Sequence, residues 1–291
     1  MSDFSNFAGM NANNFQQIAF QRQSCRTYNG LHIDKASIQL IQEKIAHLPR
    51  LFDDVATPEI RLVDNDEVEG RLGTYGFIMG ARQFLVMASG KSIAEKIQAG
   101  FMFEALVLEI TAMGLATCWL GGTFRRGLFS DVFGQLDEDK EIIIVSPVGH
   151  PTDKRRFAER MMRRFVKADA RKSFDTLFKV TEVDFDGLNN NIVNKQIALP
   201  SDSSLRRVLE TVRIAPSSSN SQPWRASIEI QTNSQGKCTT EVTFNCASNN
   251  RFSAIDMGIA YCHFLYASRQ ENLNWEIERN TESVEMRFRS C

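Results

Sequence analysis

Two arginines with a serine between them form the first cluster in this sequence that could do chemistry. Arg22, Ser24 and Arg26 follow residues 15–20, whose pattern predicts a short helix. Two guanidinium groups spaced four residues apart could converge, with the hydroxyl, on one phosphate or carboxylate. Exposed arginines usually only solvate a surface, so the cluster alone is a weak indication of an anion site.

A second polar cluster lies between two prolines in the run APSSSNSQPW, residues 215–224. Pro216 and Pro223 each fix φ and lack an N–H donor, which ends the helical pattern before them. Between the prolines, hydroxyls, amides and free backbone N–H groups form a dense row of hydrogen-bonding atoms. The alternating residues 224–230 then predict a strand. Most loops of this kind are simple connections, so this one gains meaning only together with other motifs.

Two adjacent glycines form a third candidate, in the run TCWLGG at residues 117–122. Glycine lets the backbone approach a flat ligand closely, and the N–H groups can donate to it. A turn beneath a buried tryptophan is the alternative interpretation. A metal site is not indicated, because the six cysteines include no CxxC pair and the four histidines lack the spacing of zinc ligands.

Periodicity predicts the helices and strands that must position these motifs. Asp34 is expected to cap an amphipathic helix. Residues 101–113 and 254–267 are apolar nearly all round and should form central, buried helices. On the second of these, His263 is predicted to be a hydrogen-bonded core histidine rather than a catalytic base. Strands are expected at residues 60–63, 84–88, 141–151, 224–230, 241–246, 275–278 and 284–288.

Two connecting segments have an unusual composition. Residues 154–172 are rich in basic residues, and apolar residues recur within the segment at helical spacing. It therefore predicts an amphipathic helix with a charged, solvated face. Residues 183–200 have the polar, Asn-rich composition of a connection, and the domain boundary is placed there. The expected domains are residues 1–185 and 186–291.

The two parts of the chain resemble one another in their order of elements. Both run helix, strand, buried helix, strand. The predicted helix at residues 36–48 corresponds to that at 205–214. Trp119, after the first buried helix, corresponds to Trp275, which follows the second 156 residues later. A tandem duplication of this kind can reproduce a two-fold dimer within one chain.

Composition bounds the class of protein. The chain has 291 residues, of which 43% are hydrophobic and 24% charged, as in a globular protein. Its net charge of -1 argues against a general binder of nucleic acids or anionic membranes, and the basic segment lacks interleaved stacking aromatics. No apolar run approaches the ~20 residues that span a bilayer, and the N-terminus lacks a secretory pattern. The scattered cysteines favour reduced thiols and a cytoplasmic location.

Taken together, the motifs resemble those of the FMN-dependent nitroreductase family. RQSCRTY resembles its N-terminal FMN-phosphate motif and APSSSNSQPW its second motif. GLATCWLGG resembles its third, and VGHP followed by RKSFDTLF its closing phosphate-binding segment. Ordinary members carry every motif in each subunit and bind FMN at a homodimer interface. Here the first half lacks the PSxxNxQPW loop, and the second half has that loop and none of the others. This division resembles the tandem-repeat branch of the family.

The resemblance implies both a fold and a site. The fold is α+β, with two tandem halves that each hold a mostly antiparallel sheet flanked by helices and together form an intramolecular pseudo-dimer. No catalytic side chain is implied, because the flavin N5 carries the chemistry. Two alternatives stay open: Gln222 could hold the loop instead, and Arg155 or Arg156 could replace Lys172 at the phosphate. The implied FMN-binding residues are Arg22, Gln23, Ser24, Arg26, Leu120, Gly121, Gly122, Arg171, Lys172, Pro216, Ser217, Ser218, Asn220 and Gln222.

The implied activity is that of an FMN-dependent oxidoreductase. Hydride would pass from NADH or NADPH through FMN N5 to a small electron-poor acceptor such as a nitroaromatic or a quinone. The alternative is an FMN-binding protein of the same fold with another flavin chemistry, or with no enzymatic activity. No nucleic-acid or membrane partner is expected, and a monomer is possible because the dimer interface would be internal.

Overall fold

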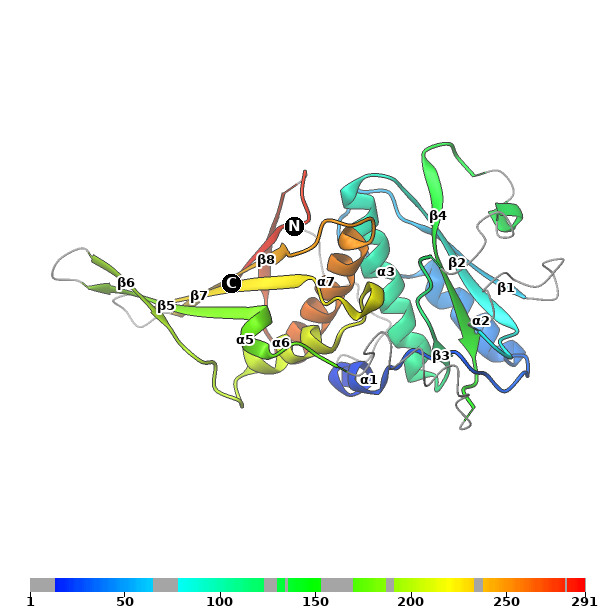
Figure 1. Cartoon of the computed structure of the whole chain (residues 1–291), viewed down its shortest axis with the longest axis horizontal. Helices are drawn as coiled ribbons and strands as arrows, with labels where there is room; N and C mark the ends of the chain where they lie inside the picture. Colours follow the sequence, from blue (N-terminus) through cyan, green and yellow to red (C-terminus); the bar gives the residue numbers. More distant parts are fainter. Residues whose placement is uncertain are drawn as a thin grey trace.

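The computed structural model describes residues 14–64, 78–122, 130–133, 136–152, 170–186, 191–232, 238–280 and 282–290. Two long helices, α3 (Ile93–Ala112) and α7 (Ser253–Gln270), lie side by side, with one β-sheet on either side of the pair (Figure 1). Both helices are buried along most of their length, as their apolar sequences predict. The expected α+β class is confirmed.

The first sheet has the strand order β1-β2-β4-β3, and every neighbouring pair is antiparallel. Its strands are β1 (Glu59–Asp64), β2 (Gln83–Gly90), β3 (Ala116–Thr117) and β4 (Lys140–Gly149). Strand β2 is buried on both faces. Its continuous apolar run, with no alternation, is the pattern of a central strand covered on both sides.

The second sheet has the strand order β6-β5-β7-β8-β10-β9. Strand β5 runs parallel to β7, and the other neighbours are antiparallel. Its strands are β5 (Phe178–Asp186), β6 (Asn191–Gln196), β7 (Trp224–Thr232), β8 (Cys238–Cys246), β9 (Trp275–Arg279) and β10 (Met286–Ser290).

The expectation that residues 183–200 form only a connection is wrong. Strand β5 extends into this segment and pairs with β6, which lies wholly within it. Backbone pairing to β7 holds β5 in the sheet, and the buried side chains of Phe178, Val180 and Val183 are of types that favour strands. The expected division between residues 185 and 186 therefore falls inside β5, and membership of the second sheet begins at Phe178. The division stays a prediction about the sequence repeat.

The two parts of the chain share one order of elements. The first runs α2 (Lys35–Ala46), β1, β2, α3, β3, β4, and the second runs α6 (Ser204–Ile214), β7, β8, α7, β9, β10. The sheet orders β1-β2-β4-β3 and β7-β8-β10-β9 match position by position. Strands β5 and β6 extend the second sheet beyond β7. The predicted correspondence of the helices at 36–48 and 205–214 agrees with this order.

The crossing of α3 and α7 is close and reciprocal. A Cβ added at Gly100 of α3 would lie 2.2 Å from the carbonyl oxygen of Ile255. One added at Gly258 of α7 would lie 2.1 Å from the carbonyl oxygen of Ile97. Glycine at both positions lets the two backbones touch. Each helix thus offers the other the same contact, as in an isologous interface between two copies.

The starts of α2 and α3 are capped by side chains, whereas the start of α7 is not. Asp34 caps α2 as expected, accepting a hydrogen bond from the Ser37 N–H at 3.0 Å. Helix α3 starts with a capping box between Ser92 and Glu95. Helix α7, by contrast, has Phe252 at its N-cap position and no side-chain cap. None of the described helices is long and apolar enough to cross a membrane.

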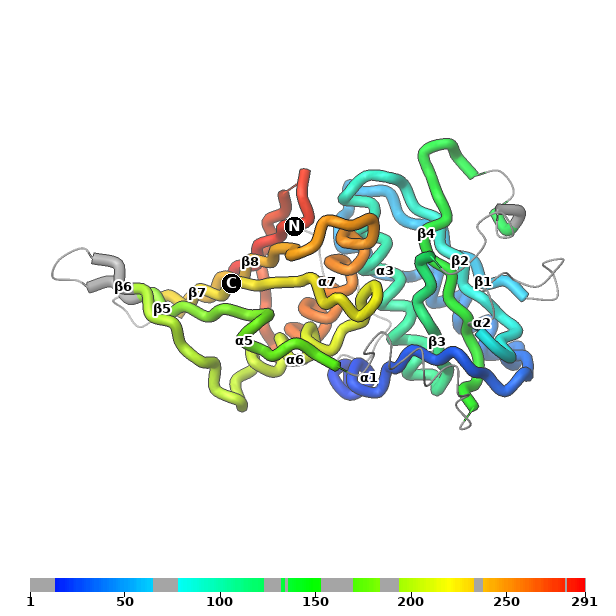
Figure 2. Tube along the Cα trace, in the orientation of Figure 1, coloured from blue at the N-terminus to red at the C-terminus, as the bar shows by residue number. Residues whose placement is uncertain are grey.

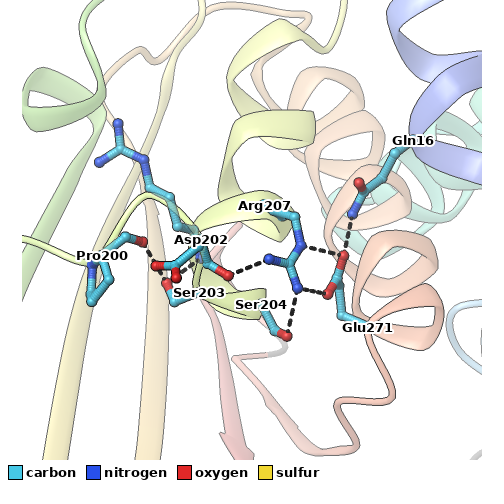
Figure 3. A network of polar contacts seen from close by, with 8 residues as sticks. Gln16, Pro200, Asp202, Ser203, Ser204, Arg207 and Glu271 are labelled. Atoms are coloured by element: carbon cyan, nitrogen blue, oxygen red, sulfur yellow. Dashed lines mark hydrogen bonds and ion pairs between the residues drawn. The ribbon is translucent and has the colours of Figure 1, made fainter.

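A polar network fixes the N-terminal helix α1 (Phe15–Gln21) beside α6 (Figures 2 and 3). Arg207 of α6 donates from Nε to Glu271, just past α7, at 2.8 Å, and Gln16 of α1 donates to the same carboxylate at 2.9 Å. The hydrogen bond from Arg207 holds the pKa of Glu271 below its usual value. The network joins three helices that are far apart in sequence and so places Arg22, the residue after α1.

Candidate functional site

The three first-half motifs come together in the structure. The backbone of Ser24 bridges Thr117, and the Cys25 N–H donates to the Thr117 carbonyl at 2.9 Å. On the other side, the Thr152 N–H donates to the Thr27 carbonyl at 3.3 Å. The arginine segment is therefore held between the strand that leads to the glycine turn and the end of the VGHP motif.

Within this segment the two arginines differ in their surroundings. Arg22 is buried, and its Nε lies 4.0 Å from Oε1 of Glu104. Arg26 is half-buried, and its Nη1 has no hydrogen-bond partner among the described residues. Ser24 is half-buried beside them, whereas Gln23 is exposed. A buried guanidinium donor without a protein acceptor is what an anion site offers its ligand.

Glu104, on α3, is a residue that the sequence interpretation missed. Its carboxylate is fully buried and accepts hydrogen bonds from Trp119 Nε1 at 3.0 Å and His263 Nε2 at 2.9 Å. The available signal was a carboxylate flanked on both sides by apolar residues of a buried helix. The prediction that His263 is a hydrogen-bonded core histidine is confirmed.

The glycine turn faces the second half of the chain. A Cβ at Gly121 would lie 2.5 Å from the ring of Phe252, and one at Gly122 would lie 2.8 Å from Arg251 Nη2. Arg251 also donates to the Gly121 carbonyl at 3.4 Å. Leu120 pairs with Val145 of β4 and anchors the turn to the first sheet. Packing against the ring of Phe252 therefore restricts Gly121, whereas the end of the exposed Arg251 side chain could move aside from a Cβ at Gly122. No sequence motif indicated residues 251 and 252.

The proline-bounded loop of the second half has an unusual backbone. Ser219, Asn220 and Gln222 have φ values of 51°, 54° and 47°. Such left-handed conformations are uncommon for residues other than glycine, and three within four positions mark a tightly determined loop. The Gln222 N–H donates to the Ser217 hydroxyl at 2.9 Å, which closes the loop on itself.

Arg171 and Lys172 donate hydrogen bonds that hold this loop in place. Arg171 donates from Nη1 to Asn220 Oδ1 at 3.1 Å and from Nη2 to the Ile214 carbonyl at 3.2 Å. Lys172 donates from Nζ to the Ser221 carbonyl at 2.7 Å. Burial lowers the pKa of Lys172, and the charge of Arg225 adds to that effect. The structure thus brings these two cations to the loop.

Gln222 has the contacts of a residue that shapes the loop. Its side chain is buried, accepts a hydrogen bond from the Lys172 N–H at 2.8 Å and donates to the Ala170 carbonyl at 3.3 Å. These bonds match the alternative left open by the sequence, in which Gln222 supports the loop. Pro216 and Ser217 are half-buried at its start. Arg155 and Arg156 lie outside the described residues, as does most of the expected amphipathic helix.

The start of α7 contacts the motifs of both halves. Asp256, in its first turn, accepts a hydrogen bond from the Ser218 N–H at 2.9 Å, while Phe252 packs on Gly121. Asp256 is almost fully buried. Burial raises the pKa of its carboxyl to about 7, and the hydrogen bond from the Ser218 N–H opposes the rise. The sequence interpretation missed Asp256, although an acid among apolar helix residues was a signal.

The glycine turn and the serine loop meet at the start of α7, and the arginine segment lies against the strand before that turn. Together with the α+β fold, this arrangement defines a nitroreductase-like protein. The family described as "Putative TM nitroreductase" matches residues 14–268, and the chain belongs to this family. No curated protein matches the chain.

A solved structure agrees with this assignment at the level of the fold, and two further structures are similar to about half of the chain. A putative nitroreductase from Thermotoga maritima MSB8 is 17% identical, with a TM-score of 0.56, and the match covers 94% of this chain and 93% of that one. An FMN-dependent nitroreductase from Clostridium difficile R20291 is 15% identical, with a TM-score of 0.40, over 48% of this chain and 88% of that one. Nitroreductase A from Vibrio parahaemolyticus RIMD 2210633 is 19% identical, with a TM-score of 0.40, over 50% and 70%.

Proposed function

We propose that the chain is an FMN-dependent oxidoreductase that carries hydride from NADH or NADPH to a small electron-poor acceptor, such as a nitroaromatic or a quinone. The observation that carries the proposal is the convergence of the motifs. The arginine segment lies against the strand that leads to the glycine turn. The start of α7 contacts both that turn and the serine loop.

We also propose that the two halves form an intramolecular pseudo-dimer with one FMN site. The shared order of elements, the matching sheet orders and the reciprocal glycine contact support this reading. So does the division of motifs, since each half supplies the ones that the other lacks. A single chain would then suffice for the site, and the protein could act as a monomer in the cytoplasm.

The residues present fit FMN. A phosphate dianion needs several donors, and Arg22, Ser24 and Arg26 provide two guanidinium groups and a hydroxyl on one short segment. The buried Nη1 of Arg26, with no protein acceptor among the described residues, favours this role. The hydroxyls and amides of the serine loop would serve the polar edge of the ring. Arg171, Lys172 and Gln222 would act mainly by holding that loop, as their hydrogen bonds indicate.

The chain's own task is binding and orientation. Bound FMN supplies hydride acceptance and donation at N5, so no side-chain acid or base is required for that transfer. Arg22 and Arg26 would fix the phosphate end. The glycine turn and the serine loop would fix the two faces of the site and exclude water. Positioning of this kind accounts for a large share of the rate of a bimolecular transfer.

The first test is the visible absorption spectrum of the purified protein, with the heat-released chromophore identified. Flavin bands with about one FMN per chain are expected. Arg22→Ala and Arg26→Ala should each weaken FMN binding at least tenfold, which is about 1.4 kcal/mol. Arg289→Ala is the matched control, because Arg289, on β10, pairs with Glu241 of β8 and not with the motifs. Full FMN content in both site variants would refute the site assignment.

A second assay distinguishes the enzyme from the alternative, an FMN-binding protein without this reaction. Steady oxidation of NADH or NADPH in the presence of menadione is expected of the enzyme. A protein that retains FMN but oxidises neither donor would be a binder, or would have another flavin chemistry.

A further inference from the structure

Glu104 is a buried charge at the centre of the molecule, and three separate segments contact or approach it. It lies on α3, with no exposed surface. Trp119 reaches it from the strand before the glycine turn, and His263 reaches it from α7 of the second half. Arg22, at the start of the arginine segment, lies 4.0 Å away. One carboxylate therefore links two of the motifs that were found independently in the sequence.

The two carboxylate oxygens of Glu104 have different partners. Oε1 accepts from His263 at 2.9 Å and is the oxygen nearest to Arg22. Oε2 accepts from Trp119 at 3.0 Å. Rotation of the carboxylate would break at least one of these contacts, so its orientation fixes the indole and the imidazole together. A glutamine in its place would offer one acceptor where two N–H donors need partners.

His263 is enclosed on the side away from Glu104. Its Nδ1 is buried and has no hydrogen-bond partner among the described residues, and the ring lies edge-on to Phe15 at 5.8 Å between centroids. Its hydrogen bond through Nε2 therefore goes to Glu104, at 2.9 Å. The guanidinium of Arg22 is the cation that approaches the same carboxylate oxygen.

We propose that Glu104 is a positioning residue of the cofactor site and that His263 extends this role to the second half of the chain. The proposal rests on the proposed function, in which Arg22 holds the FMN phosphate. Glu104 fixes the guanidinium of Arg22 and, through Trp119, the start of the glycine turn. His263 holds the carboxylate in the orientation that both need. The site then depends on the second half through α7 as well as through the serine loop.

A purely structural role for Glu104 makes a different prediction from a positioning role. If Glu104 acts through Arg22, its replacement matters much less once Arg22 is gone. A residue that only stabilises the fold would have the same effect in either background. A double-mutant cycle on FMN affinity separates the two.

The experiment measures the FMN dissociation constant by quenching of flavin fluorescence, without turnover. Glu104→Gln should weaken binding at least tenfold in the wild-type background and at most threefold in the Arg22→Ala background. Equal losses in both backgrounds would overturn the proposal. Glu109→Gln is the matched control, since Glu109 lies on the same helix and pairs with Lys44 at 3.1 Å. It should bind FMN within twofold of the wild type.

Thermal unfolding of the FMN-free variants gives a second readout. Arg22→Ala leaves the Glu104 carboxylate buried without its cation, and such a charge is strongly destabilising. Adding Glu104→Gln should therefore raise the melting temperature of the Arg22→Ala variant. A further fall would overturn the charge balance proposed for this cluster. If Glu104→Gln does not fold alone, Trp119→Phe removes one donor, keeps an aromatic ring, and should weaken FMN binding at least threefold.

The contribution of His263 is tested by a pair of variants. His263→Gln keeps an N–H donor near the position of Nε2 and should bind FMN within threefold of the wild type. His263→Leu removes the donor and should bind at least fivefold more weakly. Wild-type affinity in the leucine variant would overturn the link across the halves.

Failure of this proposal is distinguishable from failure of the proposed function. A wild-type protein that takes up no FMN would overturn both. A wild-type protein that binds FMN, with a Glu104→Gln variant that binds it equally well, would overturn the positioning role alone.

Discussion

The two halves of the molecule repeat their packing and differ in their polar chemistry. Helices α3 and α7 cross with the same glycine contact in each direction, and the four strands of the first sheet have counterparts in the second. The cationic segment and the glycine turn, by contrast, belong to one half and the serine loop to the other. Because the repeated contacts lie in the helices and sheets, the loops can differ, and each half can carry different motifs.

The starts of the two central helices show the same difference locally. Helix α3 begins with a closed capping box in which Ser92 and Glu95 satisfy each other's backbone groups. Helix α7 begins without a side-chain cap, and its first-turn acid, Asp256, accepts from the loop residue Ser218 instead. The start of α3 therefore satisfies its own backbone groups, whereas the start of α7 makes its contacts with loops of the candidate site.

The largest expected effect tests the shared packing. Gly100→Ala and Gly258→Ala should each lower the free energy of unfolding by at least about 3 kcal/mol, because the new Cβ meets a backbone carbonyl that cannot move aside alone. The sign is opposite to that at an open helix position, where alanine is the better residue by about 1 kcal/mol. Urea unfolding of both variants measures it. The two losses should agree within about 1 kcal/mol, given the variation of such costs between sites.

Gly114→Ala is the control for this pair. Gly114 follows α3 with φ of 75° and has no atom within 4 Å of an added Cβ. Its replacement should cost only the strain of the left-handed conformation, about 1–2 kcal/mol. A Gly258→Ala variant as stable as the wild type would show that the two glycine contacts of this crossing are not equivalent.

Most of the fold could be predicted from the sequence because its signals are local. The apolar helices, the capped start of α2 and the buried strand β2 each follow from periodicity within one segment. Strands β5 and β6 could not be predicted in this way. Polar residues interrupt their apolar ones, and the place of β5 in the sheet depends on parallel pairing with β7, whose residues lie more than forty positions later in the chain.

The residues of the candidate site also fall into those with a local sequence signal and those without one. The arginine segment, the glycine turn and the serine loop were found as motifs, because their composition is distinctive within a few residues. The roles of Glu104 and Asp256 could not be predicted, since each is an isolated acid with apolar neighbours in a buried helix. Their partners, His263 and Ser218, come from distant positions, and only the fold brings them together.

The second-largest expected effect concerns Asp256, at the start of α7, and depends on pH. The folded protein raises the pKa of Asp256 from 3.8 to about 7, so between these values it binds more protons than the unfolded chain. This contribution to stability is fully present below the lower value and is lost as pH rises through the upper one. Asp256→Asn keeps an acceptor for the Ser218 N–H and removes the titration. Relative to that variant, the wild type should lose about 2–3 kcal/mol between pH 5 and pH 8.

Urea unfolding of both proteins at the two pH values measures this difference. Asp139→Asn is the control, because Asp139 is exposed and its loss tests only the general change in charge. Parallel stability curves for the wild type and Asp256→Asn would show that the carboxyl of Asp256 does not titrate in this range, and that the two helix starts differ less than their contacts suggest.

The smallest effect concerns the helix start that stabilises itself. Ser92→Ala removes the hydroxyl that accepts from the Glu95 N–H, and loss of such a cap costs about 1 kcal/mol of stability. FMN affinity should not change, because the hydrogen bonds of Ser92 go to Glu95 and not to the motifs of the site. Ser92→Thr, which keeps the hydroxyl, should restore most of the loss. A fall in FMN affinity with Ser92→Ala would mean that the start of α3 also supports the site, and that the division between the two helix starts does not hold.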